Sequence, residues 1–323
     1  MQTAEARYHP SAEQLALAST INDSLRDLLP LSRLHVASYE DAATWKSLEE
    51  IGIFGISHSE QQGGSGLGAV EEALIAAGLG ARLASAAVLA TIGAAHLRHD
   101  DRGRGMRVQR TAAAYRDSGR IIVVDEPEAE VLLLRDDGGA TLHRMPATPC
   151  GSVVDERLWL ATLRHLGDAG EPLLRCDEQQ LLRLRLIDAA ALAGIAGAAL
   201  EAAVGYAGVR EQFGRPIGSF QAVKHHCANM AIGARCARDQ VGFAAVALDE
   251  GRPDAGLQVE CALLVAGSGA LENAGKNIQI HGGIGFSDEA DPHLYLKRAQ
   301  LLLAITGGLE AASRRVAAID RGE

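Results

Sequence analysis

Residues 209–221 bring together a basic side chain, an aromatic ring and amide groups in one short segment between helical patterns. Arg210 offers a guanidinium fork that suits a pyrophosphate. Gln212 and Gln221 offer amide donors and acceptors, and Phe213 offers a flat apolar face to a ring. Taken together, these residue types indicate a binding site for a dinucleotide.

A second segment, residues 279–286, reads Gln-Ile-His-Gly-Gly-Ile-Gly-Phe. Gln279 adds a further amide, and Gly282 and Gly283 let the backbone approach a phosphate or a ribose closely. Taken singly, either segment is also typical of a solvated helix end and turn, with Arg210 as an ordinary helix-end cation. The presence of both segments, at this separation and between long helices, favours the cofactor site.

Together, the two segments resemble the C-terminal domain of the acyl-CoA dehydrogenase family. Residues 52–68, with the sequences Gly-Ile-Phe-Gly-Ile and Gly-Gly-Ser-Gly-Leu-Gly, resemble that family's N-terminal helical domain, so the resemblance covers nearly the whole chain. In this family the arginine segment of one subunit meets the Gln-x-x-Gly-Gly segment of its dimer mate. The resemblance implies FAD bound across a subunit interface by Arg210, Gln212, Phe213, Gln221, Gln279, Gly282 and Gly283.

The chemistry of this family requires a base. The resemblance implies that two hydrogens leave the α and β carbons of an acyl-CoA: a carboxylate takes the α-proton, and the flavin accepts a hydride. The carboxylate stands at one of two family positions, which Thr306 and Leu184 occupy here. Neither side chain can accept a proton near neutral pH, so no catalytic residue is assigned.

Two carboxylates are candidate substitutes for the missing base. Asp188 lies one helical turn after Leu184, and Glu310 lies one turn after Thr306, so each shares a helix face with a family position. The alternative is structural: both are ordinary helix-face residues, and Asp188 pairs with a nearby arginine such as Arg183 or Arg185.

The middle of the chain also departs from the family pattern. Residues 115–167 are about half the length of the family's β domain, and Trp159 does not match its flavin-contacting motif. Short β-type runs at 121–124 and 131–134, with a return strand at 141–145 after an Asp-Asp-Gly-Gly turn, predict a small hairpin. A β segment of this size would hold a flavin ring poorly, while the residues for the ADP part are kept.

Helical patterns position these segments. Ser11 and Gln14 form a capping-box pattern before a helix that stops at Pro30, and Asp41 can cap a second helix. Further helices are expected from Ala69 and over 85–97. Long helices, the last interrupted at the Gly-Gly pair 307–308, are expected over 188–209, 220–248, 254–276 and 292–319. Long helices with short connections predict an antiparallel four-helix bundle.

The predicted fold is mostly α and similar to acyl-CoA dehydrogenases. It comprises an N-terminal helical domain (1–112), a reduced middle β domain (113–172) and a C-terminal four-helix bundle domain (173–323). Aromatic residues make up only 4% of the chain, while Ala and Gly are abundant, which suits closely packed helices.

Composition excludes several classes of function. The net charge of −10 disfavours nucleic acid as a partner, and no uncharged stretch suggests a membrane span. The cysteines are odd in number, widely spaced and without a Cys-x-x-Cys pair: Cys150, Cys176, Cys227, Cys236 and Cys261. We therefore expect a reduced, cytoplasmic protein with no metal site.

A missing base and a reduced β segment are typical of one known arrangement. Actinobacterial degraders of sterol side chains pair short acyl-CoA dehydrogenase subunits into heterotetramers in which one chain supplies the base. By this resemblance the chain is the partner without the base, acting with a second such subunit on an acyl-CoA, for example a steroid side-chain thioester. Electron-transfer flavoprotein is the implied acceptor. The alternatives are a self-sufficient homo-oligomer that uses Asp188 as the base, and a scaffold that binds no flavin.

Overall fold

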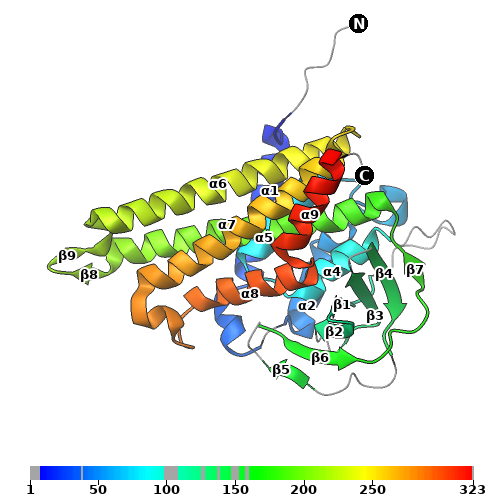
Figure 1. Ribbon diagram of the computed structural model, residues 1–323, viewed down its shortest axis with the longest axis horizontal. Helices are drawn as coiled ribbons and strands as arrows, with labels where there is room; N and C mark the ends of the chain where they lie inside the picture. Colours follow the sequence, from blue (N-terminus) through cyan, green and yellow to red (C-terminus); the bar gives the residue numbers. More distant parts are fainter. Residues whose placement is uncertain are drawn as a thin grey trace, which may run out of the picture.

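The computed structural model describes residues 8–37, 39–97, 108–124, 128–136, 139–146, 153–156 and 160–321. These residues form a long helical bundle with a single larger sheet against one of its ends (Figure 1). Trp159 and Cys150 lie outside the described residues. The mostly helical fold predicted from the sequence is confirmed.

The N-terminal helices begin where their caps predict. Ser11 and Gln14 form the expected capping box, and the side chain of Asp41 accepts a hydrogen bond from the Thr44 backbone N (2.7 Å). Ser85 caps the last helix of this group. The four helices are α1 (Ala12–Leu28), α2 (Ala42–Glu50), α3 (Ala69–Ala81) and α4 (Ala86–Ala95).

The β region is a seven-stranded sheet with strand order β5-β6-β2-β1-β3-β4-β7 in the described part of the chain. Its strands are β1 (Thr111–Asp117), β2 (Arg120–Val124), β3 (Val131–Asp136), β4 (Gly139–Arg144), β5 (Val153–Glu156), β6 (Thr162–Leu166) and β7 (Leu174–Arg175). The predicted hairpin exists as β3 and β4, with Leu133 opposite Leu142. The predicted run at 121–124 is β2, which forms a second hairpin with β1, and β1 also pairs in parallel with β3, so the sheet is larger than the predicted hairpin.

The C-terminal helices form the predicted bundle. They are α5 (Glu178–Val209), α6 (Gln221–Asp249), α7 (Ala255–His281), α8 (Pro292–Ile305) and α9 (Gly308–Arg321). Helix α5 packs against α6 and α7 on one side and against α3 on the other. A Cβ on Gly80 of α3 would lie 2.0 Å from the Ala191 carbonyl oxygen, so these two helices require a glycine at this contact. Helix α7 runs five residues beyond its predicted end, which places Gln279 in its last turn.

Helix α4 joins the sheet to the bundle. The Thr91 hydroxyl of α4 accepts a hydrogen bond from the Thr111 backbone N at the start of β1 (3.0 Å). Gly93 lies between two leucines: its Cβ would be 2.3 Å from Leu184 of α5 and 3.8 Å from Leu133 of β3. The sheet and the bundle therefore share one continuous apolar core in this region.

Among the described helices, only α5 is long and apolar enough to cross a membrane. Its most apolar window is 67% buried inside the molecule, where α3, α6 and α7 cover it. It is thus the central helix of the packed core, as its Ala-rich sequence predicted.

Candidate functional site

The first predicted segment is a tight hairpin that joins α5 to α6 at one end of the bundle (Figure 1). Strand β8 (Glu211–Gln212) pairs antiparallel with β9 (Arg215–Pro216). The two turn residues, Phe213 and Gly214, have φ of +55° and +76°, the left-handed values that a type I′ turn requires. Phe213 is 92% exposed, so this turn presents an aromatic face to the outside.

Arg210 is the C-cap residue of helix α5, and both its backbone N–H and its carbonyl are hydrogen-bonded. Its N–H donates to the Tyr206 carbonyl (2.8 Å), and its carbonyl accepts from Ile217 N (2.7 Å). Its side chain is exposed, as are those of Gln212 and of Gln221, the first residue of α6. The backbone therefore holds a guanidinium, two amides and an aromatic ring around one turn.

The second segment lies at the same end of the bundle. Gln279 is exposed in the last turn of α7, and Gly282 follows with φ +68°, ψ −144°, a conformation that favours glycine. No atom lies within 4 Å of a Cβ built on Gly282 or Gly283, so the backbone there is open to a phosphate or a ribose. The Tyr206 ring stacks on His281 at 4.0 Å between centroids, which joins the α5 end to the α7 end.

These residues fit the ADP part of FAD. All seven residues predicted to bind the cofactor are exposed, and no hydrogen bond among the described residues joins one segment to the other. Large apolar side chains within the two segments are also exposed, between 53% and 78%: Val209, Ile284 and Phe286. Exposed apolar residues gathered at one end of a molecule are typical of an interaction surface.

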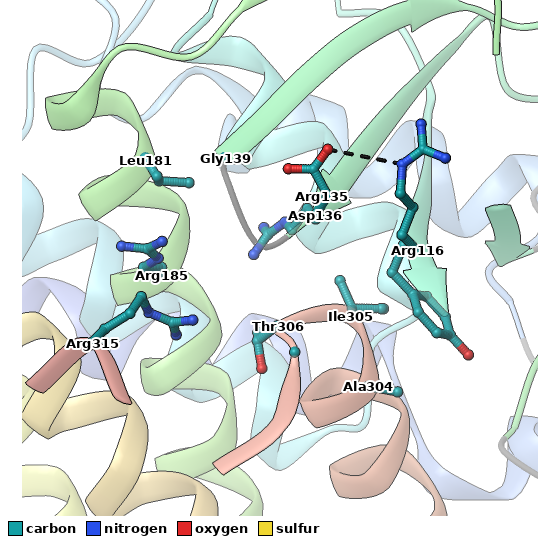
Figure 2. Close-up of a pocket in the computed structure, with 12 residues that line it drawn as sticks. Arg116, Arg135, Asp136, Gly139, Leu181, Arg185, Ala304, Ile305, Thr306 and Arg315 are labelled. Atoms are coloured by element: carbon teal, nitrogen blue, oxygen red, sulfur yellow. Dashed lines mark ion pairs between the residues drawn. The ribbon is translucent and has the colours of Figure 1, made fainter. Parts of the chain in front are cut away.

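A separate cavity of about 40 Å³ lies between the sheet and the bundle (Figure 2). Thr306, at the end of α8, lines it, and its hydroxyl donates to the Leu303 carbonyl (3.0 Å). Leu184 does not line the cavity, because its side chain is fully buried against Gly93. A space of this size holds a few water molecules.

Asp188 lies in a buried ion pair with Arg135 of β3. Burial raises the pKa of its carboxyl, and the charge of Arg135 opposes that rise. The prediction that Arg183 or Arg185 would be its partner was wrong. Arg183 lies 3.7 Å from both Glu72 and Asp249, and Arg185 lies 2.5 Å from Glu260.

Glu310 lies on the surface of α9, with its side chain 88% exposed and bonded to Arg314 (2.8 Å). It does not line the cavity. The charged residues that line it are Arg116, Arg135, Asp136, Arg185 and Arg315, and only Arg185 was named from the sequence, as a partner for Asp188. They come from β1, β3, α5 and α9, and no local pattern connects them.

Comparison with known proteins agrees with the two segments. Residues 11–98 match the description "Acyl-CoA dehydrogenase, N-terminal domain", and residues 174–319 match "Acyl-CoA dehydrogenase, C-terminal domain". The chain is 33% identical over 314 residues to acyl-CoA dehydrogenase FadE34 of Mycobacterium tuberculosis, covering 86% of this chain but 43% of that protein. It is 31% identical over 267 residues to acyl-CoA dehydrogenase IpdE2 of the same organism, covering 80% of each.

The fold is also that of solved structures. One chain of the ChsE4–ChsE5 complex of Mycobacterium tuberculosis superposes with a TM-score of 0.76 at 22% identity, covering 96% of this chain and 98% of that one. A chain of the Tcur3481–Tcur3483 steroid ACAD gives 0.76 at 24% identity, with 96% and 97% covered. The chain belongs to the acyl-CoA dehydrogenase family, whose enzymes are FAD-dependent oxidoreductases acting on CH–CH bonds.

Proposed function

We propose that this chain is the subunit without the base in a heteromeric, FAD-dependent acyl-CoA dehydrogenase. A second, related chain would supply the carboxylate that removes the α-proton. The observation that carries this proposal is the cavity at Thr306. In the described part of the chain, three carboxylates lie at it or directly behind its lining, and each is ion-paired with arginine: Asp136, Asp188 and Glu260.

Paired carboxylates are poor candidates for the base. A general base must reach the proton that it removes, and Asp188 is both buried and held by Arg135. Glu260 is bonded to two arginines, Arg185 (2.5 Å) and Arg315 (2.8 Å). The threonine hydroxyl at position 306 cannot accept a proton near neutral pH. The base of the assembly is therefore best sought in another chain.

The exposed end of the bundle supports a shared cofactor site. Arg210, Gln212, Phe213 and Gln221 would hold the ADP part of one FAD, and the backbone at Gly282 and Gly283 would line the complementary half. The bound flavin supplies the hydride acceptor. Since the two halves lie open on the surface, a partner chain can complete each of them. The exposed apolar residues Val209, Ile284 and Phe286 suit burial in that contact.

An acyl-CoA thioester is the proposed substrate, and a steroid side-chain thioester is the candidate within that class. This rests on the missing base, the shortened β region and the likeness of fold to a structure described as a steroid ACAD. A heterotetramer is the proposed assembly, and the similar ChsE4–ChsE5 structure is itself a complex. Electron-transfer flavoprotein is proposed as the electron acceptor, and the cytoplasm as the compartment.

The test is the visible spectrum and native mass of the chain, purified alone and after co-expression with a related chain encoded beside it. Flavin absorbance and a tetramer that appear only with the partner support the proposal. A yellow homo-oligomer that oxidises acyl-CoA thioesters unaided overturns it. An assembly that turns over substrate yet keeps its FAD content in an Arg210→Ala variant would overturn the cofactor role of this chain.

A further inference from the structure

The cavity between the sheet and the bundle has a strongly cationic lining. Four arginines reach it from four elements: Arg116 of β1, Arg135 of β3, Arg185 of α5 and Arg315 of α9. In Figure 2, Arg185 and Arg315 lie on one side of the cavity, and Arg116 lies on the other. Four guanidinium groups around so small a space repel one another unless negative charge is present.

The carboxylates of the chain leave this charge incompletely neutralised. Asp136 lies 4.0 Å from Arg116, and this pair is partly exposed. Asp188 pairs with Arg135, and Glu260 alone serves both Arg185 (2.5 Å) and Arg315 (2.8 Å). Among the residues that the structure describes, four guanidinium groups thus face three carboxylates, which leaves one positive charge in excess within this set.

One arginine also has a hydrogen-bond donor without an acceptor among the described residues. The Nη2 atom of Arg315 is buried and has no hydrogen-bond partner among the described residues, while its Nε is bonded to Glu260 (2.8 Å). A buried donor without a partner destabilises the fold. An acceptor that enters the cavity and reaches this atom would remove that cost, so the lining favours a bound anion.

We propose that this cavity binds the carboxylate group of a small organic acid. A carboxylate carries one negative charge, which matches the excess, and its two oxygens suit guanidinium donors. A phosphate dianion would exceed the excess charge of the described residues. The carboxylate belongs either to a free acid or to the far end of a thioester substrate. Binding needs neither flavin nor turnover, so this inference does not depend on the proposed function.

Calorimetric titration of the purified chain, or of its complex with the partner, tests the proposal. The probes are succinate, the neutral analogue succinamide and inorganic phosphate at matched ionic strength, together with succinyl-CoA and butyryl-CoA. We expect succinate or succinyl-CoA to bind, and succinamide, phosphate and butyryl-CoA to bind at least tenfold more weakly. Binding of succinate identifies a free acid. Binding of succinyl-CoA alone identifies a carboxylate on the thioester.

Two variants locate the binding. Arg315→Gln removes the spare donor and should weaken binding tenfold or more, since a charged hydrogen bond is lost. Arg314→Gln is the matched control, because Arg314 is the preceding residue, exposed and bonded to Glu310. If Arg315→Gln does not fold, Arg116→Gln at the partly exposed side replaces it, with an expected loss of threefold or more. Binding that is absent in the wild type, or equal in the cavity and control variants, overturns the proposal.

Discussion

The aromatic ring of Tyr206 lies on the imidazole of His281, with 4.0 Å between centroids and 22° between planes. The Nδ1 of His281 donates to the Asn277 carbonyl (2.9 Å), which fixes the orientation of the imidazole. Tyr206 lies in the last turn of α5, and His281 ends α7. This stack therefore sets the spacing between the arginine segment and the glycine segment of the proposed cofactor site.

Arg210→Ala should lower the FAD content of the assembly. A charged hydrogen bond contributes about 1.5–3 kcal/mol, which corresponds to roughly a 10- to 100-fold weaker affinity. Arg210→Lys keeps the positive charge but loses the bidentate guanidinium. Its FAD content should therefore lie between those of the wild type and of Arg210→Ala. The measurement is the ratio of flavin to protein absorbance after dialysis. Arg235→Ala is the control, because Arg235 is exposed on α6 and pairs only locally with Asp239 (2.5 Å). Equal FAD content in all the variants would contradict the prediction.

Phe213→Asn should leave the isolated chain as stable as the wild type or stabilise it by about 1 kcal/mol. An aromatic residue at φ +55° is strained, whereas asparagine tolerates this backbone region. The same change removes an aromatic face that is 92% exposed. Association with the partner should therefore weaken tenfold or more. Thermal unfolding of the chain alone and sedimentation of the complex measure the two effects. Unchanged association would show that Phe213 contributes nothing to assembly.

The Asp188–Arg135 pair should behave as a structural element. Asp188→Asn leaves Arg135 buried without its counterion and should destabilise the chain by about 3–5 kcal/mol. Replacing both residues, as Asp188→Leu with Arg135→Met, should cost much less, because no buried charge then remains. Urea unfolding of Asp188→Leu, Arg135→Met and the double variant gives the coupling between the two residues. Turnover by the assembly should survive Asp188→Asn in the fraction of the variant that folds. Its complete loss, with the fold intact, would revive Asp188 as the base.

The thiol of Cys176 should react slowly near neutral pH. Burial raises its pKa to about 11, with the charge of Arg135 opposing the rise. The thiolate is the reactive form, so about one thiol in a thousand is reactive at pH 8. Alkylation by iodoacetamide should accelerate about tenfold per pH unit between pH 8 and pH 10. Peptide mass spectrometry follows the reaction, with the exposed Cys236 as the accessible reference. Equal rates for the two cysteines at pH 8 would contradict this expectation.

Local hydrogen bonding explains which elements could be predicted from the sequence. The capping box at Ser11 and the side-chain cap at Asp41 each join residues three apart, and both are present as predicted. The sheet was underestimated because its longest unpredicted strand, β1, contains Ala112, Ala113 and Ala114. Alanine is a weak strand former. These residues are held instead by non-local pairing to β2 and β3.

The same distinction between local and non-local contacts decides which parts of the candidate site could be predicted. The cofactor segments are contiguous in sequence, so their residue types were visible without a structure. The partner of Asp188 was not, because Arg135 is 53 residues away and reaches it only through the packing of β3 against α5. The arginine cavity is assembled from four separate elements, and its charge balance depends on Glu260 of α7, which is shared by two of them.

Helix α5 carries Arg185 beside the cavity and Arg210 at the opposite end. At 1.5 Å per residue, the helix separates these two arginines by about 37 Å. One extended dinucleotide is too short to touch both within a single chain. In the proposed assembly each chain would therefore contribute its two ends to different ligand sites, and exchanging one subunit would alter two sites at once.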